Sequence, residues 1–410
     1  MIKGQKLVCI GGGTGLSTLL RGLREYVTDR MPMYEVIDLD GLSAIVSVAD
    51  DGGSSGRLID EFGILPPGDI RNCMVALANE SELMTGLFRF RFKGNGSLGG
   101  HSLGNILLTA LTQMNGGNLP KAIEVASKVL SIRGRILPVS LDSSVLCAEL
   151  ADGTVVEGES AIPKRPNRQP IKRIFLRRRN GSEPTPCRAY EEAVKAILQA
   201  DAIIMGPGSL YTSVMPNLAL PEIVSALRGS GAVKIYICNV MAEPGETDGY
   251  SVSDHVQTIL NHAPIKLDYV IVNDGIASDE LIRQYVREEL IEQFHRIKTQ
   301  AEEAVNALGS TECSLAELTR IAGEIADLSA DMTRIIDPSR VQILYKEEVD
   351  GPRLKGIKVI RENLITEIEI TEEHGGEVIR KRVIRHDPIK LAGVLAKTIS
   401  SKTVATVEAA

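Results

Sequence analysis

The chain has 410 residues, carries a net charge of −7 at pH 7, contains 4% aromatic residues and has no tryptophan. This composition lacks the basic surface and the aromatic stacking platform of nucleic-acid-binding proteins, so we expect no nucleic-acid partner. The length is sufficient for one large domain or for two domains of ordinary size.

The six cysteines are scattered and form no CxxC pair, a pattern typical of free thiols in a reducing compartment. No apolar run approaches the roughly 20 residues of a membrane-spanning helix. The first residues lead directly into a strand-like segment rather than a signal peptide. We therefore expect a cytoplasmic protein without a membrane partner.

The first predicted unit is a strand, a glycine turn and a helix between Lys6 and Leu23. The apolar run Leu7–Ile10 predicts a buried strand of a parallel sheet, and leucines at helical spacing follow the five small residues 11–15. This geometry directs main-chain N–H groups and a helix N-terminus toward an anion. The GxGxG spacing matches neither the GxGxxG dinucleotide fingerprint nor a Walker A loop. We favour a phosphate-binding turn of neither standard type over an ordinary tight turn.

The second predicted strand, Ser43–Val48, leads to the acids Asp50 and Asp51 and then to a run rich in glycine and serine. A Rossmann-like fold holds a ribose hydroxyl or a metal at this place, although two acids can also cap a loop. Phenylalanine and arginine then alternate over residues 88–92, which predicts an extended segment. His101 opens a predicted helix, where it is either a ligand contact or a structural histidine.

Residues 137–174 differ in character, because short alternating segments around Asp152–Gly153 predict antiparallel hairpins. The basic cluster at residues 163–180 is interrupted by three prolines. We interpret this cluster as a charged edge strand rather than a nucleic-acid site.

A second strand, glycine turn and helix begins with the predicted strand Ala202–Met205. Two such turns at the carboxyl ends of one parallel sheet would form the usual ligand crevice of that architecture. A later strand leads to Asn239 and another to Asn273. An asparagine at such a place either reads the edge of a base, as donor and acceptor together, or simply tolerates the turn.

These segments predict an α/β fold: a Rossmann-like core with a parallel sheet and helices on both faces, plus an antiparallel β insertion and a helical and β C-terminal insertion. We expect a single domain over residues 1–410, with its core at about 1–134, 191–275 and 385–400. The β-rich insertion is expected at about 135–180, and the helical and β insertion at about 278–384.

A set of motifs, in order along the chain, together resembles the CofD-like superfamily. The motifs are GGGTGLSTLLRGL, IVSVADDGGSSGRL, LPPGDIRNCMVAL, GGHSLGNILLTAL, ADAIIMGPGSLYTSVMPNL, NVMAEPGET and RHDP. The resemblance is strongest to the YvcK branch, the gluconeogenesis factors that bind UDP-sugars, and it implies a nucleotide in the crevice of a Rossmann-like core. Ala242–Glu243 stands where that branch has a Thr–Gln pair, and Pro388 stands where many relatives have a hydroxyl residue.

The resemblance also implies roles for individual residues. The first glycine turn should line the nucleotide site, the second should cradle phosphate and sugar, and Asn239 should face the base. Arg385 should pair with a diphosphate through charge-assisted hydrogen bonds. The implied site residues are Gly12, Gly13, Thr14, Gly15, Asp50, Asp51, Gly52, Asn72, His101, Asn105, Gly206, Pro207, Gly208, Ser209, Tyr211, Asn239, Tyr285 and Arg385.

Three functions are compatible with this sequence. The first is a regulatory protein, not an enzyme, that binds UDP-N-acetylglucosamine or UDP-glucose, needs no cofactor and links carbon metabolism to cell-wall synthesis and cell shape. The second is a phospholactyl transferase that uses a nucleoside-diphosphate donor and Mg²⁺ held by Asp50 and Asp51. The third, an NAD-dependent dehydrogenase, is least supported because the glycine spacing does not match. The resemblance implies a homo-oligomer.

Overall fold

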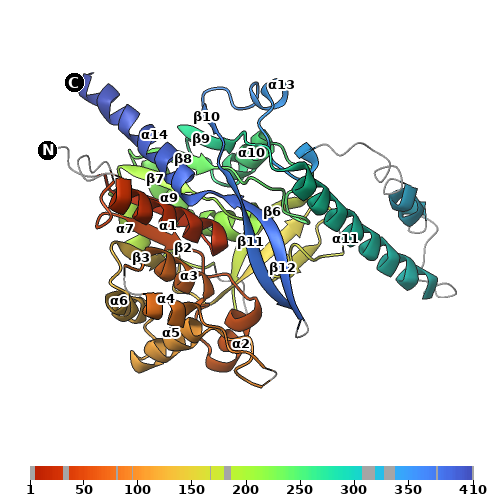
Figure 1. Ribbon diagram of the computed structural model, residues 1–410, viewed down its shortest axis with the longest axis horizontal. Coiled ribbons are helices and arrows are strands. Elements are labelled where there is room, and N and C mark those ends of the chain that lie inside the picture. The colour runs from red at the N-terminus through yellow and green to blue at the C-terminus, as the bar shows by residue number, and fades with distance from the viewer. Residues whose placement is uncertain are drawn as a thin grey trace.

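The computed structural model describes residues 5–30, 37–79, 82–94, 96–166, 168–179, 186–306, 319–326, 338–374 and 377–408. Its centre is a seven-stranded sheet in the order β10-β9-β8-β7-β1-β2-β3, in which every neighbouring pair is parallel (Figure 1). These strands are β1 (Leu7–Gly11), β2 (Ser43–Val46), β3 (Arg135–Pro138), β7 (Ala202–Met205), β8 (Val233–Ile237), β9 (Tyr269–Asn273) and β10 (Lys358–Glu362).

The chain reverses its direction of travel across the sheet between β1 and β7. It first runs outward through β2 to β3, then returns beside β1 at β7 and runs outward on the other side through β8, β9 and β10. Right-handed crossovers in opposite directions place the helices of the two halves on opposite faces, so the inner strands are buried and read as continuous apolar runs. The predicted Rossmann-like α/β core is confirmed, and its ligand crevice is expected where β1 and β7 end.

The helices are listed here by their bounds. They are α1 (Gly13–Arg30), α2 (Gly53–Phe62), α3 (Gly68–Leu77), α4 (Glu82–Arg89), α5 (Leu103–Met114), α6 (Leu119–Val129), α7 (Glu191–Leu198), α8 (Met215–Leu218), α9 (Pro221–Gly229), α10 (Val252–His262), α11 (Asp279–Asn306), α13 (Glu347–Asp350) and α14 (Pro388–Glu408), with a π-helical turn η1 (Leu210–Val214) and a 3₁₀ turn η2 (Pro338–Arg340).

Helix α1 shows how the helical spacing of leucines places this element. Leu16, Leu19, Leu20 and Leu23 are fully buried, as expected for the apolar face of a helix that covers a sheet. The helix also packs against α3 and against the C-terminal helix α14, which lies along it in Figure 1. Helix α14 begins beside the middle of α1, since a Cβ atom on Gly22 would clash with the carbonyl oxygen of Pro388.

Two smaller antiparallel sheets are attached to this core. One has the order β5-β4-β6, formed by β4 (Ser144–Leu150), β5 (Val155–Glu157) and β6 (Ile171–Arg178), and the other pairs β11 (Ile365–His374) with β12 (Glu377–His386). Strands β3 and β10 form the two edges of the main sheet. Their residues were expected to belong to the two insertions, so the boundaries predicted for the core differ from the structure at these strands.

The expected extended segment at residues 88–92 is only partly extended. Phe88 and Arg89 close helix α4, with Phe88 2% exposed, and the chain leaves the helix before Arg91 forms a bridge to Ser102. Because Phe88 packs into the core, this part of the chain is helical, although the alternation of phenylalanine and arginine predicted an extended segment. Within the described residues, no helix is both long and apolar enough to cross a membrane.

Candidate functional site

The first glycine turn connects β1 to α1 without any intervening loop. β1 ends at Gly11 and α1 begins at Gly13, whose φ of +59° lies in the left-handed region that favours glycine. A Cβ atom on Gly12 would come within 2.7 Å of Asp69 Oδ2. Because the first N–H groups of a helix have no intrahelical acceptor, this turn presents main-chain donors at the end of the sheet.

The second glycine turn follows β7 and touches the first. The Gly206–Pro207 peptide is cis, and Gly206 has a φ of +79°. A Cβ atom on Gly15 would lie 2.3 Å from the carbonyl oxygen of Pro207 and 2.7 Å from Cα of Gly208. The two turns are therefore in main-chain contact across the boundary between β1 and β7.

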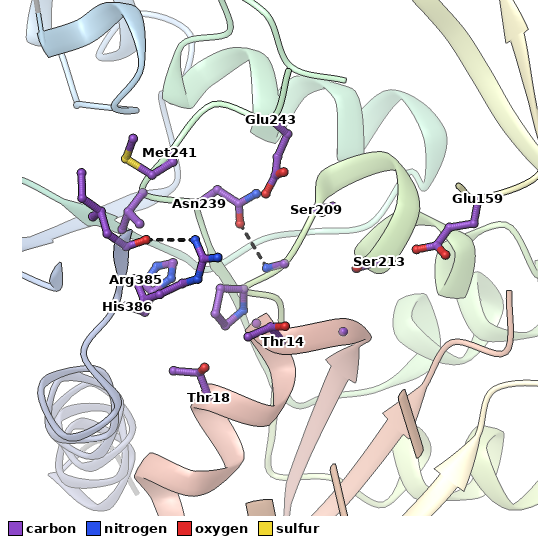
Figure 2. A pocket seen from close by; sticks show the side chains of 16 residues that line it. Thr14, Thr18, Glu159, Ser209, Ser213, Asn239, Met241, Glu243, Arg385 and His386 are labelled. Carbon is purple, nitrogen blue, oxygen red and sulfur yellow. Dashed lines mark hydrogen bonds between the residues drawn. The ribbon is translucent and has the colours of Figure 1, made fainter. Parts of the chain in front are cut away.

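A cavity of about 350 Å³ opens between the two turns, within the range of small-molecule sites (Figure 2). Strand ends on both sides of the switch point contribute to its wall, together with β12 and the turn that follows β5. The lining residues are Gly13, Thr14, Gly15, Thr18, Glu159, Pro207, Gly208, Ser209, Ser213, Asn239, Val240, Met241, Glu243, Ile384, Arg385 and His386.

Asn239 connects the second turn to the end of β8. Its Oδ1 accepts a hydrogen bond of 3.1 Å from the main-chain N–H of Gly208, while its Nδ2 is buried and has no hydrogen-bond partner. The side chain is 6% exposed and lines the cavity. A buried amide donor without a partner is costly unless a ligand or water supplies an acceptor, so Nδ2 marks a contact point for a bound molecule.

The wall formed by β12 carries Arg385 and His386. Nη1 of Arg385 donates a 3.1 Å hydrogen bond to the carbonyl of Ile384, which is drawn in Figure 2. Burial lowers the pKa of His386 to about 4, so its imidazole is neutral at pH 7. Burial raises the pKa of the Glu243 carboxyl, while Arg385 and Ser209 act in the opposite direction. Arg385 therefore supplies the positive charge of this wall.

The helix N-terminus after the second turn is bound by an acidic side chain of the protein. The carboxylate of Glu246 accepts hydrogen bonds from Tyr211 N at 3.1 Å and from Thr212 Oγ1 at 2.9 Å. An internal carboxyl group, whose pKa burial raises to about 7, thus occupies the position that the strand–turn–helix pattern assigned to a ligand. Tyr211 itself is 2% exposed, and its hydroxyl contacts the Tyr250 hydroxyl at 2.8 Å rather than lining the cavity.

The acids after β2 have distinct positions. Both oxygens of Asp51 accept main-chain hydrogen bonds of 2.9 Å, from Glu159 and from Ser160. Asp50 accepts from Gly52 N at 3.0 Å and lies close to Gly68, since a Cβ there would be 2.4 Å from Asp50 Oδ2. Asp50, Asp51 and Gly52 stand behind the cavity wall and are not among its lining residues.

Three predicted residues of the α3 and α5 region form a network beside these acids. His101 Nδ1 lies 2.9 Å from Ser54 Oγ, which also accepts from Asn105 Nδ2 at 3.1 Å. Asn72 donates from its side chain to Asp69, whose pKa is raised to about 7 by burial and by Asp50. His101, Asn72 and Asn105 do not line the cavity, but Asp69 also accepts a hydrogen bond from the main-chain N–H of Gly13, which does line it.

Tyr285 does not line the cavity but contacts a residue that does. Its hydroxyl accepts a 3.1 Å hydrogen bond from the main-chain N–H of Ile384, the residue before Arg385. The tyrosine therefore positions the β12 segment that carries Arg385.

The cavity lining combines predicted and unpredicted residues. The structure brings Gly13, Thr14, Gly15, Pro207, Gly208, Ser209, Asn239 and Arg385 together, and it places Gly12 and Gly206 in the main chain directly behind them. Sequence reasoning missed Thr18, Glu159, Ser213, Val240, Met241, Glu243, Ile384 and His386 as lining residues. Thr18 and Ser213 could have been found, because each lies one helical turn beyond a glycine turn.

A magnesium ion at Asp50 and Asp51 would share Asp51 with two main-chain hydrogen bonds. Both Asp51 oxygens are engaged by main-chain N–H groups, and no group of three or more His, Cys, Asp or Glu side chains in the described part of the chain is placed to hold a metal ion. Magnesium usually binds through one or two carboxylates together with phosphate oxygens and water, so magnesium at this pair stays a prediction.

Glu159 should make stability depend on pH. Burial, followed by Asp50, Asp69, Asp51 and Glu246, raises its pKa from 4.5 to about 9. Between these two pH values the folded state keeps a proton that the unfolded state has released. The contribution of Glu159 to the free energy of unfolding is therefore complete below pH 4.5 and is lost as the pH rises to about 9. The slope is at most about 1.4 kcal/mol per pH unit.

We expect the free energy of unfolding to fall between pH 7 and 8.5, and to fall less in the Glu159→Gln variant, which has no such proton. Urea denaturation at intervals across this range measures both slopes. Glu157→Gln is the control. Glu157 lies two residues before Glu159 and forms an exposed ion pair with Arg177, so this variant should retain the wild-type dependence of unfolding free energy on pH. Identical slopes for the wild type and Glu159→Gln would show that the carboxyl is already ionised.

The chain matches one protein-family model and is similar to solved structures. A family model described as 2-phospho-L-lactate transferase CofD matches residues 7–312. A crystal structure of a Bacillus halodurans protein is 36% identical, covers 96% of this chain and 99% of its own, and has a TM-score of 0.71.

Curated relatives are similar over about two thirds of the chain. The gluconeogenesis factor of Halalkalibacterium halodurans is 45% identical over 72% of this chain and 87% of its own length. The gluconeogenesis factor of Bacillus subtilis is 46% identical over 69% of this chain and 83% of its own. A relative from Clostridium acetobutylicum is 47% identical over 70% of this chain, and the match spans 59% of that longer protein.

Proposed function

Because the chain belongs to the CofD family and is similar to gluconeogenesis factors, we propose that it is a regulatory protein that binds a UDP-sugar. In this proposal it reports the supply of nucleotide sugars, such as UDP-N-acetylglucosamine or UDP-glucose, to carbon metabolism and cell-wall synthesis. One observation carries the proposal: two glycine turns in main-chain contact face one cavity that also holds Arg385 and the unpartnered Nδ2 of Asn239.

Each part of a nucleoside diphosphate has a counterpart in this cavity. The N-terminus of α1 and the cation of Arg385 suit the diphosphate, because main-chain donors and guanidinium groups both form charge-assisted hydrogen bonds with phosphate oxygens. Asn239 Nδ2 suits a carbonyl acceptor such as those of uracil. Glu159 lies beyond the diphosphate position, where the sugar would be bound.

A ligand panel tests this proposal directly. Calorimetry and thermal shift with UDP, UDP-glucose, UDP-N-acetylglucosamine, GDP and NAD should give binding heat and a raised melting temperature for the uridine compounds, since a ligand that prefers the folded state stabilises it. The proposal fails if purified protein gives neither heat nor a thermal shift with any UDP-sugar.

A transferase is the second candidate, favoured by the description of the matching family model. It would break the bond between the two phosphates of a nucleoside-diphosphate donor and transfer the distal phosphoryl group to an acceptor hydroxyl, releasing a nucleoside monophosphate. This chain's contribution would be main-chain donors that stabilise the charge on the leaving phosphate. Incubation with a guanosine-diphosphate-linked lactate donor, a deazaflavin acceptor and Mg²⁺ distinguishes the candidates, because release of GMP with transfer product requires an enzyme.

Arg385→Ala is expected to weaken binding of UDP and of UDP-sugars by a similar factor, roughly 10- to 100-fold, because both share the diphosphate that the guanidinium contacts. The affinity of Arg385→Lys should lie between those of the wild type and Arg385→Ala, because an ammonium group keeps the positive charge but lacks the planar pair of donors. Calorimetry measures the three affinities.

Arg361→Ala is the matched control, because this arginine of β10 pairs with Asp274 and is not a lining residue. It should bind all ligands as the wild type does. A loss in Arg385→Ala that affects the UDP-sugar and spares UDP would place Arg385 at the sugar instead.

A further inference from the structure

The two ends of the cavity carry different ionisable groups. Arg385 lies on one side, and Glu159 faces the cavity from the opposite side, beyond Ser213 (Figure 2). The glycine turns lie between them. A ligand that spans the cavity with a diphosphate over the turns therefore places its terminal group next to Glu159.

Glu159 is held in place by the core of the protein although it belongs to the inserted β sheet. Its main-chain N–H and that of Ser160 both donate to the Asp51 carboxylate at 2.9 Å. Gly158 has a φ of +102°, and a Cβ there would lie 2.8 Å from Asp51 Oδ2. Asp51 is thus a positioning residue that fixes the turn carrying Glu159 against the end of β2.

The charged residues with the largest effects on Glu159 are all acidic. Asp50, Asp69, Asp51 and Glu246 all raise its pKa, after the larger effect of burial, to about 9. At pH 7 the Glu159 carboxyl is protonated, so it both donates and accepts hydrogen bonds. The acidic side chains behind it make this end of the cavity unfavourable for a further anion.

We propose that Glu159 binds the neutral, hydroxyl-bearing terminal group of a nucleoside diphosphate sugar, and that the acidic end of the cavity rejects ligands whose terminal group is a carboxylate. This inference rests on the proposed function and adds the class of terminal group that the site accepts. A protonated carboxyl group can both donate a hydrogen bond to a sugar hydroxyl and accept one from it. A terminal carboxylate on the ligand would instead add a negative charge next to the acidic side chains.

UDP-glucose and UDP-glucuronate test this, because they differ at one carbon, where a hydroxymethyl group replaces a carboxylate. Calorimetry at pH 7.5 on the full chain should give at least tenfold tighter binding of UDP-glucose than of UDP-glucuronate, and tighter binding of UDP-glucose than of UDP. In Glu159→Ala the affinity for UDP-glucose should fall to within about twofold of that for UDP, with the affinity for UDP unchanged.

Two further variants separate hydrogen bonding from charge. Glu159→Gln should keep the preference for UDP-glucose, because an amide also donates and accepts, and Glu159→Lys should prefer UDP-glucuronate. Glu157→Ala, which removes an acid outside the cavity lining, should match the wild type with all three ligands.

The failure of this inference differs from the failure of the proposed function. If the wild type binds UDP and both UDP-sugars equally well, or if Glu159→Ala retains the wild-type gain of UDP-glucose over UDP, the role of Glu159 is overturned and the nucleotide site stands. If none of the three ligands binds, the proposed function itself is overturned.

Discussion

Replacing Gly15 with alanine is expected to lower UDP-sugar affinity at least a hundredfold. The added Cβ would lie 2.3 Å from the Pro207 carbonyl oxygen and 2.7 Å from Cα of Gly208, and these are main-chain atoms that cannot rotate away. The two glycine turns must therefore separate, which moves the donors of both turns out of position. Overpacking of this kind also costs about 1–3 kcal/mol of stability. Calorimetry with UDP-glucose gives the affinity, and urea denaturation gives the stability.

Gly134→Ala is the control for Gly15→Ala, because it creates a similar clash at a site unrelated to the cavity. A Cβ on Gly134, which has a φ of +87°, would lie 2.7 Å from the carbonyl oxygen of Leu42, at the start of β3 and away from the carboxyl ends of the strands. This variant should lose stability and keep its affinity. Wild-type affinity in Gly15→Ala would mean that contact between the turns is not needed for binding.

Asn239→Asp is expected to weaken UDP-sugar binding by at least a hundredfold while keeping the turn intact. An aspartate retains the acceptor for Gly208 N, so the hydrogen bond of 3.1 Å can still form. It replaces the unpartnered Nδ2 donor by a buried negative charge in a cavity that we propose binds an anion. Asn239→Ala, without that charge, should lose less affinity than Asn239→Asp in the same calorimetric titration.

Asn273→Asp provides a matched control on the neighbouring strand, at the end of β9. Its Nδ2 donates to the Gly275 carbonyl and its Oδ1 accepts from Gly275 N and Leu364 N, so its amide is satisfied within the protein. The substitution should cost stability and leave ligand affinity unchanged. If the two aspartate variants lose affinity to the same extent, the effect reflects general destabilisation, and Asn239 has no special role.

The two turns illustrate how far a local pattern can be trusted. Both strand and glycine-turn positions follow from neighbouring residues, but only the first turn leads directly into an α-helix, whereas the second leads into the π-helical turn η1. What each helix N-terminus binds is decided by residues far away. Glu246, 35 residues after Tyr211, satisfies the second helix N-terminus, and nothing in the turn sequence indicates it.

Glu159 shows the same limit for a single side chain. Its segment reads as one side of an exposed hairpin, and the residues around it carry no motif. Its place in the cavity depends on Asp51, which is 108 residues earlier in the chain. For the acids after β2 the sequence left a ligand contact, a metal and a loop cap open, and the structure shows that Asp51 holds this turn.

The sequence by itself determined the class of fold, the core strands β1, β2, β7, β8 and β9 and the positions of the two glycine turns. These features follow from short apolar runs, helical spacing and glycines, all of which act over a few residues. The tertiary structure alone decided which polar groups face the cavity, which are satisfied internally and which carboxyls hold protons. Those properties depend on burial and on contacts between distant segments, because a low-dielectric environment and a neighbouring charge exist only once the chain has folded.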